Sequence, residues 1–218
     1  MTASDVLART QIDAELASLP AWRYGQGALC TALKCPTSAA ALDLFASIGG
    51  LAQAANHHPD VDWRYDTLFV TLTSHDAGSA VTARDTALAA TISAAAAAMG
   101  ATARPELLRT VEIAIDTDDV DAISATWRTA LGYKRQEDGS LADPMGRGPS
   151  LWFQETATPN TNRFHVDVIV PFSESGPVLD ALAATGAALD RGQAPMFVVA
   201  TDTQGNRLCI CTEEGRTK

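Results

Sequence analysis

The chain has 218 residues, of which 46% are hydrophobic and 19% are charged. This composition is typical of a globular protein and excludes disorder over the whole chain. The formal net charge is −10, with 5 Lys/Arg against 9 Asp/Glu in residues 1–103 and 11 against 17 in residues 104–218. Because both acidic halves would repel a phosphate backbone, we expect no direct nucleic-acid binding. No apolar run approaches about 18 residues and no signal peptide is recognisable, so we expect a cytoplasmic protein without membrane contact.

The first half predicts alternating helices and short strands. Apolar residues at helical spacing predict a helix within 2–18, and the glycine-containing segment 22–33 predicts a hairpin. Thr37 or Ser38 is expected to cap a second helix that runs to about residue 56. A strand is predicted at 65–73, and a third helix, capped by Thr82, is predicted to end near Met99. We therefore predict a domain at 1–100 and a linker at 101–109.

The second half, residues 110–218, predicts a second domain with an internal repeat. A strand, a helix and a short meander occur twice, about 53 residues apart. Each unit alone would leave one face of a small sheet exposed, so we expect the two units to pair. The predicted elements are strands at 110–115, 150–155, 163–170, 197–201 and 207–211, and helices at 120–131 and 178–184.

Four cysteines do not suffice for a disulfide framework, and we expect buried free thiols. Cys209 and Cys211 are two residues apart on a predicted strand and should share one of its faces.

Three of the four histidines, His57, His58 and His75, lie within 19 residues. The first two are at the predicted end of the second helix, and the third follows the strand 65–73. If that strand runs beside the helix end, the three imidazoles converge on one cleft. Histidine exchanges protons near neutral pH, which favours acid/base chemistry there. A zinc site is less well suited, because adjacent helical residues point about 100° apart.

The run Gln53-Ala54-Ala55-Asn56-His57-His58-Pro59, followed by Tyr65, Thr73-Ser74-His75-Asp76 and Thr82 to Asp85, resembles the pterin-4a-carbinolamine dehydratases over roughly residues 4–98. The resemblance implies an α+β fold with a four-stranded antiparallel sheet and helices on one face. It also implies dehydration of 4a-hydroxytetrahydropterin to quinonoid dihydropterin, without metal or organic cofactor.

By this resemblance His57, His58 and His75 form the catalytic set, with acid and base unassigned among them. We expect the substrate-binding residues to include Trp22, Gln53, Asp76 and Asp85. Asp85 either orients a histidine or caps its helix, and Trp22 either stacks on the pterin or is a structural aromatic. The family usually has an acidic residue at the position of Gln53, so rate or substrate choice is expected to differ.

The segments Leu151 to Glu155, Asn162 to Val168 and Asp202 to Cys209 resemble the glyoxalase-like branch of the vicinal-oxygen-chelate superfamily over about residues 110–213. This resemblance implies two paired βαβββ modules. Its metal-ligand positions fall on Glu112, Glu155 and His165. Because Cys211 and Thr212 stand where a further glutamate is expected, we favour a module without metal, in which Arg163 or Arg207 pairs with these side chains.

The sequence thus predicts a pterin dehydratase fused to an accessory glyoxalase-like domain of unknown ligand, assembled as a homo-oligomer, with a dimer favoured. Two alternatives remain open. One is a non-catalytic binding or dimerisation protein with the pterin-dehydratase fold. The other is a metal-dependent glyoxalase- or dioxygenase-like enzyme in the second half.

Overall fold

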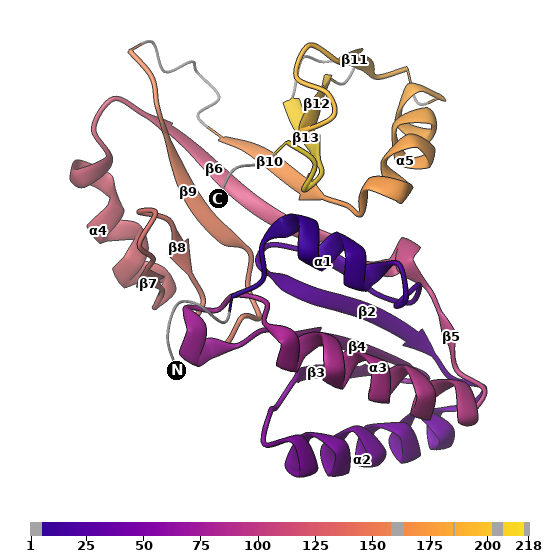
Figure 1. The fold of residues 1–218 in the computed structure, drawn as a ribbon. Helices are drawn as coiled ribbons and strands as arrows, with labels where there is room; N and C mark the ends of the chain where they lie inside the picture. Colours follow the sequence, from indigo (N-terminus) through magenta and orange to yellow (C-terminus); the bar gives the residue numbers. More distant parts are fainter. Residues whose placement is uncertain (1–5, 158–163, 185, 202–206, 216–218) are drawn as a thin grey trace. The chain divides into compact units, whose positions relative to one another are not determined.

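The computed structural model describes residues 6–157, 164–184, 186–201 and 207–215. Contacts divide the chain into two compact units, Met1–Leu108 and Arg109–Lys218, each with its own sheet (Figure 1). The segment predicted as a linker contains a short strand, β5 (Thr102–Ala103), which pairs with a strand of the first sheet. Residues 101–108 therefore belong to the first unit, and the second unit begins at Arg109.

The first unit is an antiparallel sheet in the order β1-β2-β4-β3, with the short β5 paired to β2 beside β1. The four-stranded antiparallel prediction is confirmed, and β5 extends it. Its elements are α1 (Arg9–Leu16), β1 (Arg23–Gly25), β2 (Ala28–Lys34), α2 (Ser38–Ala55), β3 (Asp60–Arg64), β4 (Thr67–Leu72), the 3-10 turn η2 (His75–Ala77), α3 (Ala83–Ala98), β5 (Thr102–Ala103) and the 3-10 turn η3 (Pro105–Leu107).

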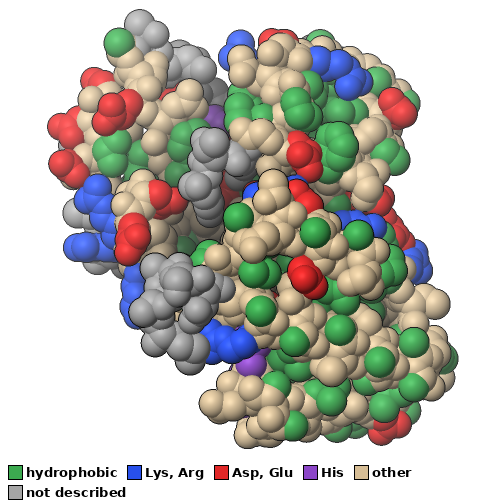
Figure 2. Space-filling model, in the orientation of Figure 1, with side chains coloured by type: hydrophobic (Ala, Val, Ile, Leu, Met, Phe, Trp, Pro, Cys, Tyr) green, Lys and Arg blue, Asp and Glu red, His purple; other side chains and the backbone are tan. Residues whose placement is uncertain are grey.

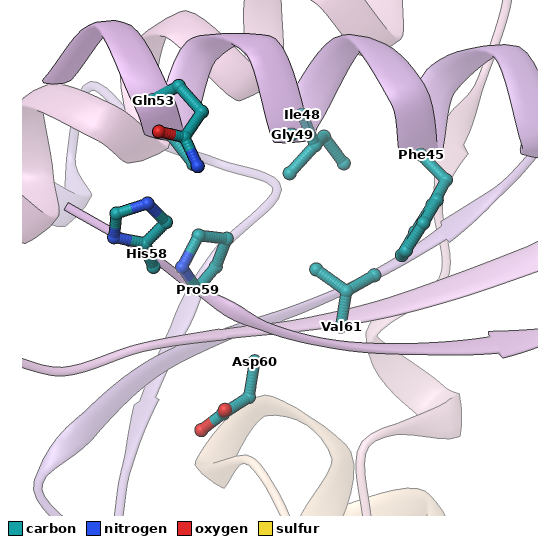
Figure 3. A pocket seen from close by; sticks show the side chains of 9 residues that line it. Phe45, Ile48, Gly49, Gln53, His58, Pro59, Asp60 and Val61 are labelled. Atoms are coloured by element: carbon teal, nitrogen blue, oxygen red, sulfur yellow. The ribbon is translucent and has the colours of Figure 1, made fainter. Parts of the chain in front are cut away.

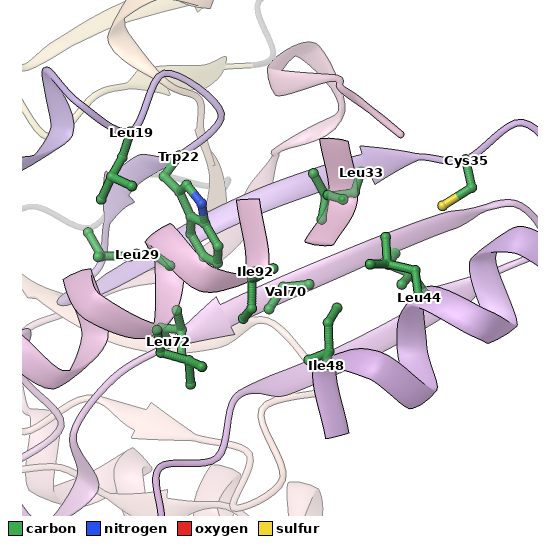
Figure 4. Close-up of a cluster of buried hydrophobic side chains, with 14 of the residues drawn as sticks. Leu19, Trp22, Leu29, Leu33, Cys35, Leu44, Ile48, Val70, Leu72 and Ile92 are labelled. Carbon is green, nitrogen blue, oxygen red and sulfur yellow. The ribbon is translucent and has the colours of Figure 1, made fainter. Parts of the chain in front are cut away.

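The helices of the first unit bury their apolar sides on one face of this sheet, as predicted. Strand residues on that face meet Leu44 and Ile48 of α2 and Ile92 of α3 in one cluster, and all three helical side chains are at most 1% exposed (Figure 4). The strand side of the cluster consists of Leu29, Leu33, Leu68, Val70 and Leu72.

Helix α2 has 18 residues and a mean hydropathy that would allow it to cross a membrane by length and composition alone. Its Leu44 and Ile48 side instead packs in the core, as in the core helix of a globular protein. Leu42 and Phe45 on its other sides remain 48% and 41% exposed, and many small apolar side chains are visible over α2 and α3 in Figure 2.

The second unit has one eight-stranded sheet in the order β11-β12-β13-β10-β6-β9-β8-β7. In each half the first strand pairs in parallel with the last, and β6 pairs antiparallel with β10 at the centre. The two predicted βαβββ modules are therefore confirmed. Their elements are β6 (Thr110–Thr117), α4 (Val120–Leu131), β7 (Lys134–Arg135), β8 (Leu141–Ala142) and β9 (Ser150–Glu155), then β10 (Phe164–Ile169), α5 (Phe172–Ala184), β11 (Ala188–Asp190), β12 (Phe197–Thr201) and β13 (Arg207–Cys211).

Side-chain alternation gives this second sheet an apolar face and a polar face. Ile113, Ile115 and Leu151 pack with Trp127 of α4, and Val198 and Ile210 pack with Leu179 of α5. Neighbouring strand positions carry the polar residues. The face opposite the two helices, called the polar face below, carries Glu112, His165 and Asp167. It also carries a smaller apolar cluster, which consists of Ile169, Cys209 and Cys211 with Phe197 and Val199.

Candidate active site

The first unit holds a buried, hydrogen-bonded histidine–carboxylate pair between the end of α2 and the start of α3. His57 Nε2 lies 2.7 Å from Asp85 Oδ1, and the two side chains are 7% and 0% exposed. The other carboxylate oxygen of Asp85 accepts hydrogen bonds from Ser74 Oγ at 2.8 Å, from Thr82 N at 2.7 Å and from Thr82 Oγ1 at 3.0 Å. Both carboxylate oxygens of Asp85 thus accept hydrogen bonds from within the protein.

Local sequence explains why these groups meet. Thr82 and Asp85 form a capping box at the start of α3, so the carboxylate is held at the helix N-terminus, where negative charge is favoured. Helix α2 ends at Asn56, which adopts a left-handed conformation with φ 46°. His57 N then donates to the Ala52 carbonyl at 3.1 Å. Asp85 therefore both caps its helix and orients His57, the two roles that the sequence left open.

His58, unlike His57, faces solvent and lines a hollow of about 330 Å³ between α2 and β3. Figure 3 shows His58 and Pro59 below Gln53 of α2, with Phe45 at the other end of the hollow. The turn at Asn56 thus sends two adjacent imidazoles to different environments. One is buried and paired, and the other is open to a ligand.

His75 begins the turn η2 and is exposed. Its neighbour Ser74 is fully buried and donates a hydrogen bond to Asp85. The buried His57–Asp85 pair is thereby linked to the turn that carries His75. His75 is not among the residues that line the hollow. The structure therefore connects His57 to the His75 turn through Asp85 and Ser74, and places His58 alone of the three at the hollow.

Asp76 and Trp22, like Asp85, are predicted substrate-binding residues that have partners within the protein. Asp76 is held by Arg84, with Arg84 Nη2 2.5 Å from Asp76 Oδ1, and this guanidinium keeps the pKa of the Asp76 carboxyl below its usual range. Trp22 is 2% exposed and donates to Ser93 Oγ at 2.9 Å within the core. Gln53, by contrast, lines the hollow.

Sequence reasoning missed Ser74, Phe45 and strand β3. The signal for Ser74 is a small polar residue at a strand end, shortly before a Thr-x-x-Asp capping box. The signal for Phe45 is its position two helical turns before Gln53. Strand β3 has an exposed pattern at four of its five positions, which conceals it from hydrophobic periodicity.

In the second unit the predicted ligand set Glu112, Glu155 and His165 does not come together on one face. Glu112 pairs with Ser150 and His165 pairs with Ala114, both on the polar face, whereas Glu155 pairs with Thr117. Since side chains alternate along a strand, Glu155 points to the opposite face.

The predicted charge partners and thiols of the second unit can be placed in part. Arg163 and the turn 202–206 lie outside the described residues, and Arg207 is exposed. All four cysteines are free thiols, and three of them are buried as predicted, whereas Cys30 is only half-buried. Cys209 and Cys211 share one face.

Comparisons with known proteins separate the two units in the same way. The family model described as pterin 4 alpha carbinolamine dehydratase matches residues 5–95, and that of a glyoxalase-like domain matches residues 112–211. A relative from Mycobacterium leprae, named as a pterin-4-alpha-carbinolamine dehydratase, is 38% identical over 84 residues, which are 38% of this chain and 88% of the relative. One from Chloroflexus aurantiacus with the same name is 37% identical over 86 residues, covering 39% and 91%.

Two solved structures are also similar to parts of the chain. A protein titled transcriptional coactivator/pterin dehydratase from Brucella melitensis covers 42% of this chain and 98% of its own length, with 26% identity and a TM-score of 0.40. A glyoxalase/bleomycin resistance protein/dioxygenase superfamily member from Vibrio splendidus covers 49% and 100%, with 13% identity and a TM-score of 0.33. On the strength of the sequence matches, the chain belongs to the pterin-4a-carbinolamine dehydratase family through its first unit and carries a glyoxalase-like domain in its second.

Proposed function

We propose that the first unit dehydrates a 4a-hydroxytetrahydropterin to the quinonoid dihydropterin by histidine acid/base catalysis. The observation that carries the proposal is the arrangement at the end of α2, where His58 lines a hollow while His57 beside it is anchored to Asp85. A hollow of about 330 Å³ is at the lower end of the range for small-molecule sites, about 300–1,000 Å³, and suits a bicyclic ring.

The proposed reaction is an elimination of water assisted by an acid and a base. A general acid protonates the hydroxyl oxygen, the carbon–oxygen bond breaks and water leaves. The neighbouring ring nitrogen loses its proton to a base, and its electron pair forms the new carbon–nitrogen double bond. Because the step passes no electrons to or from a second molecule, we propose that it needs neither metal nor organic cofactor.

The environments of the three histidines support different roles. His58 has direct access to the hollow, and we propose that it transfers a proton at the bound ring. His75 is exposed on the turn fixed by Ser74, and we propose that it serves as the second acid/base group. The ring nitrogen of His57 already contacts Asp85, so we propose that His57 acts as a positioning residue.

Phe45 and Gln53 supply the features by which the hollow would recognise a pterin. Phe45 presents an aromatic ring at one end of the hollow, where it would pack against a flat bicyclic ligand. The Gln53 amide both donates and accepts hydrogen bonds, which matches the mixed donors and acceptors at a pterin edge. Trp22 takes no part in this proposal because it is buried in the core.

The test is the rate of 4a-carbinolamine dehydration by purified full-length protein. Replacing His58 or His75 by alanine is expected to lower kcat at least about tenfold, because a positioned acid/base group typically contributes about 10²- to 10⁴-fold. Lys134→Ala, at an exposed position of β7, is the matched control and should leave the rate unchanged. Equal rates in all four proteins would refute the proposal.

A positioning role for His57 gives a different signature. We expect His57→Gln to lower kcat more than it changes KM, because the side chain acts through its neighbour. A protein that binds dihydropterin in a calorimeter but shows no turnover in any form would instead support the non-catalytic binding protein.

A further inference from the structure

The turn that carries His75 is attached on both sides to the first turn of α3. His75 begins η2, and its neighbours along the chain are Ser74 and Asp76. Ser74 Oγ donates a hydrogen bond to Asp85 Oδ2 at 2.8 Å. Asp76 accepts two hydrogen bonds from the guanidinium of Arg84. The residues before and after His75 are therefore each bound to one of two adjacent residues of α3.

Helix geometry explains how adjacent residues reach opposite sides of one turn. Successive side chains on an α-helix point about 100° apart. Asp85 points inward and is fully buried, whereas the side chain of Arg84 is 33% exposed and meets Asp76 at the surface. The attachment through Asp85 is thus part of the core, and the attachment through Arg84 is a surface ion pair beside His75.

The surface attachment is a forked contact. Arg84 Nη2 lies 2.5 Å from Asp76 Oδ1, and Nη1 of the same guanidinium lies 3.2 Å from Oδ2. Two parallel hydrogen bonds from an arginine fix the orientation of a carboxylate as well as its distance. Because Asp76 directly follows His75 in the chain, this contact restrains the end of the turn that the buried Ser74 does not hold.

The imidazole of His75 depends on this turn for its position. None of the described residues forms a hydrogen bond with that side chain. The turn is closed by its backbone, with Ala77 N donating to the Ser74 carbonyl at 3.0 Å and Gly78 N donating to the His75 carbonyl at 3.3 Å. A shift of about 1 Å in a reacting group can cost about 10²-fold in rate, so a proton transfer by His75 requires a firmly held turn.

We propose that Arg84 is a positioning residue that acts through Asp76 to hold the imidazole of His75 where it exchanges a proton with the substrate. This inference rests on the proposed dehydration and on the role proposed there for His75. The sequence predicts substrate binding by Asp76, whereas in the structure Arg84 engages both oxygens of its carboxylate. Asp76 thus supports the site from behind its histidine.

A pair that only stabilised the fold would behave differently. The side chains of Arg84 and Asp76 are 33% and 50% exposed, and exposed ion pairs contribute little to the free energy of unfolding. Loss of the pair should therefore change the urea midpoint of the first unit only slightly at neutral pH. A substantial loss of rate would then arise at His75.

The test is a kinetic double-mutant cycle between Arg84 and His75 in the full-length protein. Arg84→Met should lower kcat for 4a-carbinolamine dehydration about tenfold and change KM less than about twofold, because the groups that contact substrate are retained. In a His75→Ala background the same substitution should have no further effect on kcat, since no imidazole is left to position. Arg84→Lys keeps the charge but loses the fork, so its kcat should lie between those of the wild type and Arg84→Met. Arg64→Met is the matched control at the exposed Arg64–Asp62 pair of β3 and should keep the wild-type kcat.

A second measurement examines the turn without requiring turnover. Hydrogen exchange of the Ala77 and Gly78 amides, followed by NMR, should be faster in Arg84→Met than in the wild type and unchanged in Arg64→Met. The proposal is overturned if Arg84→Met keeps the wild-type kcat, if it lowers kcat equally in the His75→Ala background, or if both amides exchange at the wild-type rate. A wild type without dehydratase activity would refute the proposed function instead, and the exchange rates would still decide whether Arg84 holds the turn.

Discussion

Asp85→Asn is the most informative single change in the first unit, because it removes one charge and keeps the shape of the side chain. Asp85 is fully buried and receives hydrogen bonds from His57, Ser74 and Thr82. An asparagine side chain has one oxygen that can continue to cap α3. Its amide group would then face His57 Nε2, which must accept a hydrogen bond where it contacted a carboxylate.

The expected cost follows from these contacts. A buried hydrogen bond to a charged group contributes about 1.5–3 kcal/mol, and the helix-capping contact, worth about 1 kcal/mol, is retained if the amide oxygen faces Thr82. We therefore expect Asp85→Asn to lower the free energy of unfolding of the first unit by about 1.5–3 kcal/mol. Asp85→Ala removes both functions and leaves His57 buried without its carboxylate, so it should cost about 3–5 kcal/mol.

A double-mutant cycle with His57→Gln isolates the pairwise contribution. Urea unfolding is followed by tryptophan fluorescence in a background with Trp127→Phe and Trp152→Phe, so that the signal comes from the first unit, where Trp22 is buried. Contacting groups of this kind couple by about 0.5–3 kcal/mol, whereas independent sites add within about 0.3–0.5 kcal/mol. Additive effects of Asp85→Asn and His57→Gln would refute the reasoning that the pair is an energetic unit.

Three further changes test other parts of the first unit. Gln53→Glu places a carboxylate across the hollow from an imidazole and should raise the pKa of that imidazole, shifting the pH–rate profile for dehydration to higher pH; an unchanged profile would contradict this geometry. Arg84→Met removes the partner that lowers the pKa of Asp76. Because the pair stabilises the fold above the unfolded pKa of about 3.9 and this contribution is lost as pH falls through the lowered folded pKa, urea midpoints measured from pH 7 to pH 2 should fall less steeply in the variant. Ile48→Ala, in a side chain 1% exposed, should cost about 2–5 kcal/mol in urea unfolding, against about 0.5 kcal/mol or less for Leu42→Ala, which is 48% exposed.

Capped helices and buried strands could be predicted from the sequence because local chemistry specifies them. Thr37 and Thr82 accept hydrogen bonds from the first turns of α2 and α3, as their positions before apolar helical patterns indicated. Strand β4 was recognisable from its β-branched residues. Strands β3 and β5 were missed because they lie at sheet edges and are mostly exposed, so their sequences do not carry the apolar alternation of a buried strand.

The site was predictable only as a set of residues near one another in the fold. That His57 and His58 differ in environment follows from their adjacency, but the sequence does not indicate which of them is buried. The left-handed turn at Asn56 and the carboxylate of Asp85 decide this together.

In the second unit Glu155 lies one position along β9 from Gln154, the residue that points to the polar face, and so points to the opposite face. Side-chain direction alternates at every position along a strand, and pairing register is a property of the sheet. The same alternation brings Asp167 opposite Cys209, a partnership that is invisible until β10 and β13 are paired.

The His57–Asp85 pair of the first unit and the polar residues around His165 of the second unit differ in how closely they are tied to the folding of their units. In the first unit Asp85 belongs at once to the capping box of α3 and to the His57 pair, so a substitution that alters the site also weakens the fold. In the second unit His165 and Asp167 lie on the sheet face away from α4 and α5, while the apolar clusters that hold these helices use the intervening strand positions. Substitution of His165, which is partly exposed, should therefore leave the second unit folded. For the first unit, loss of activity must be read alongside loss of stability.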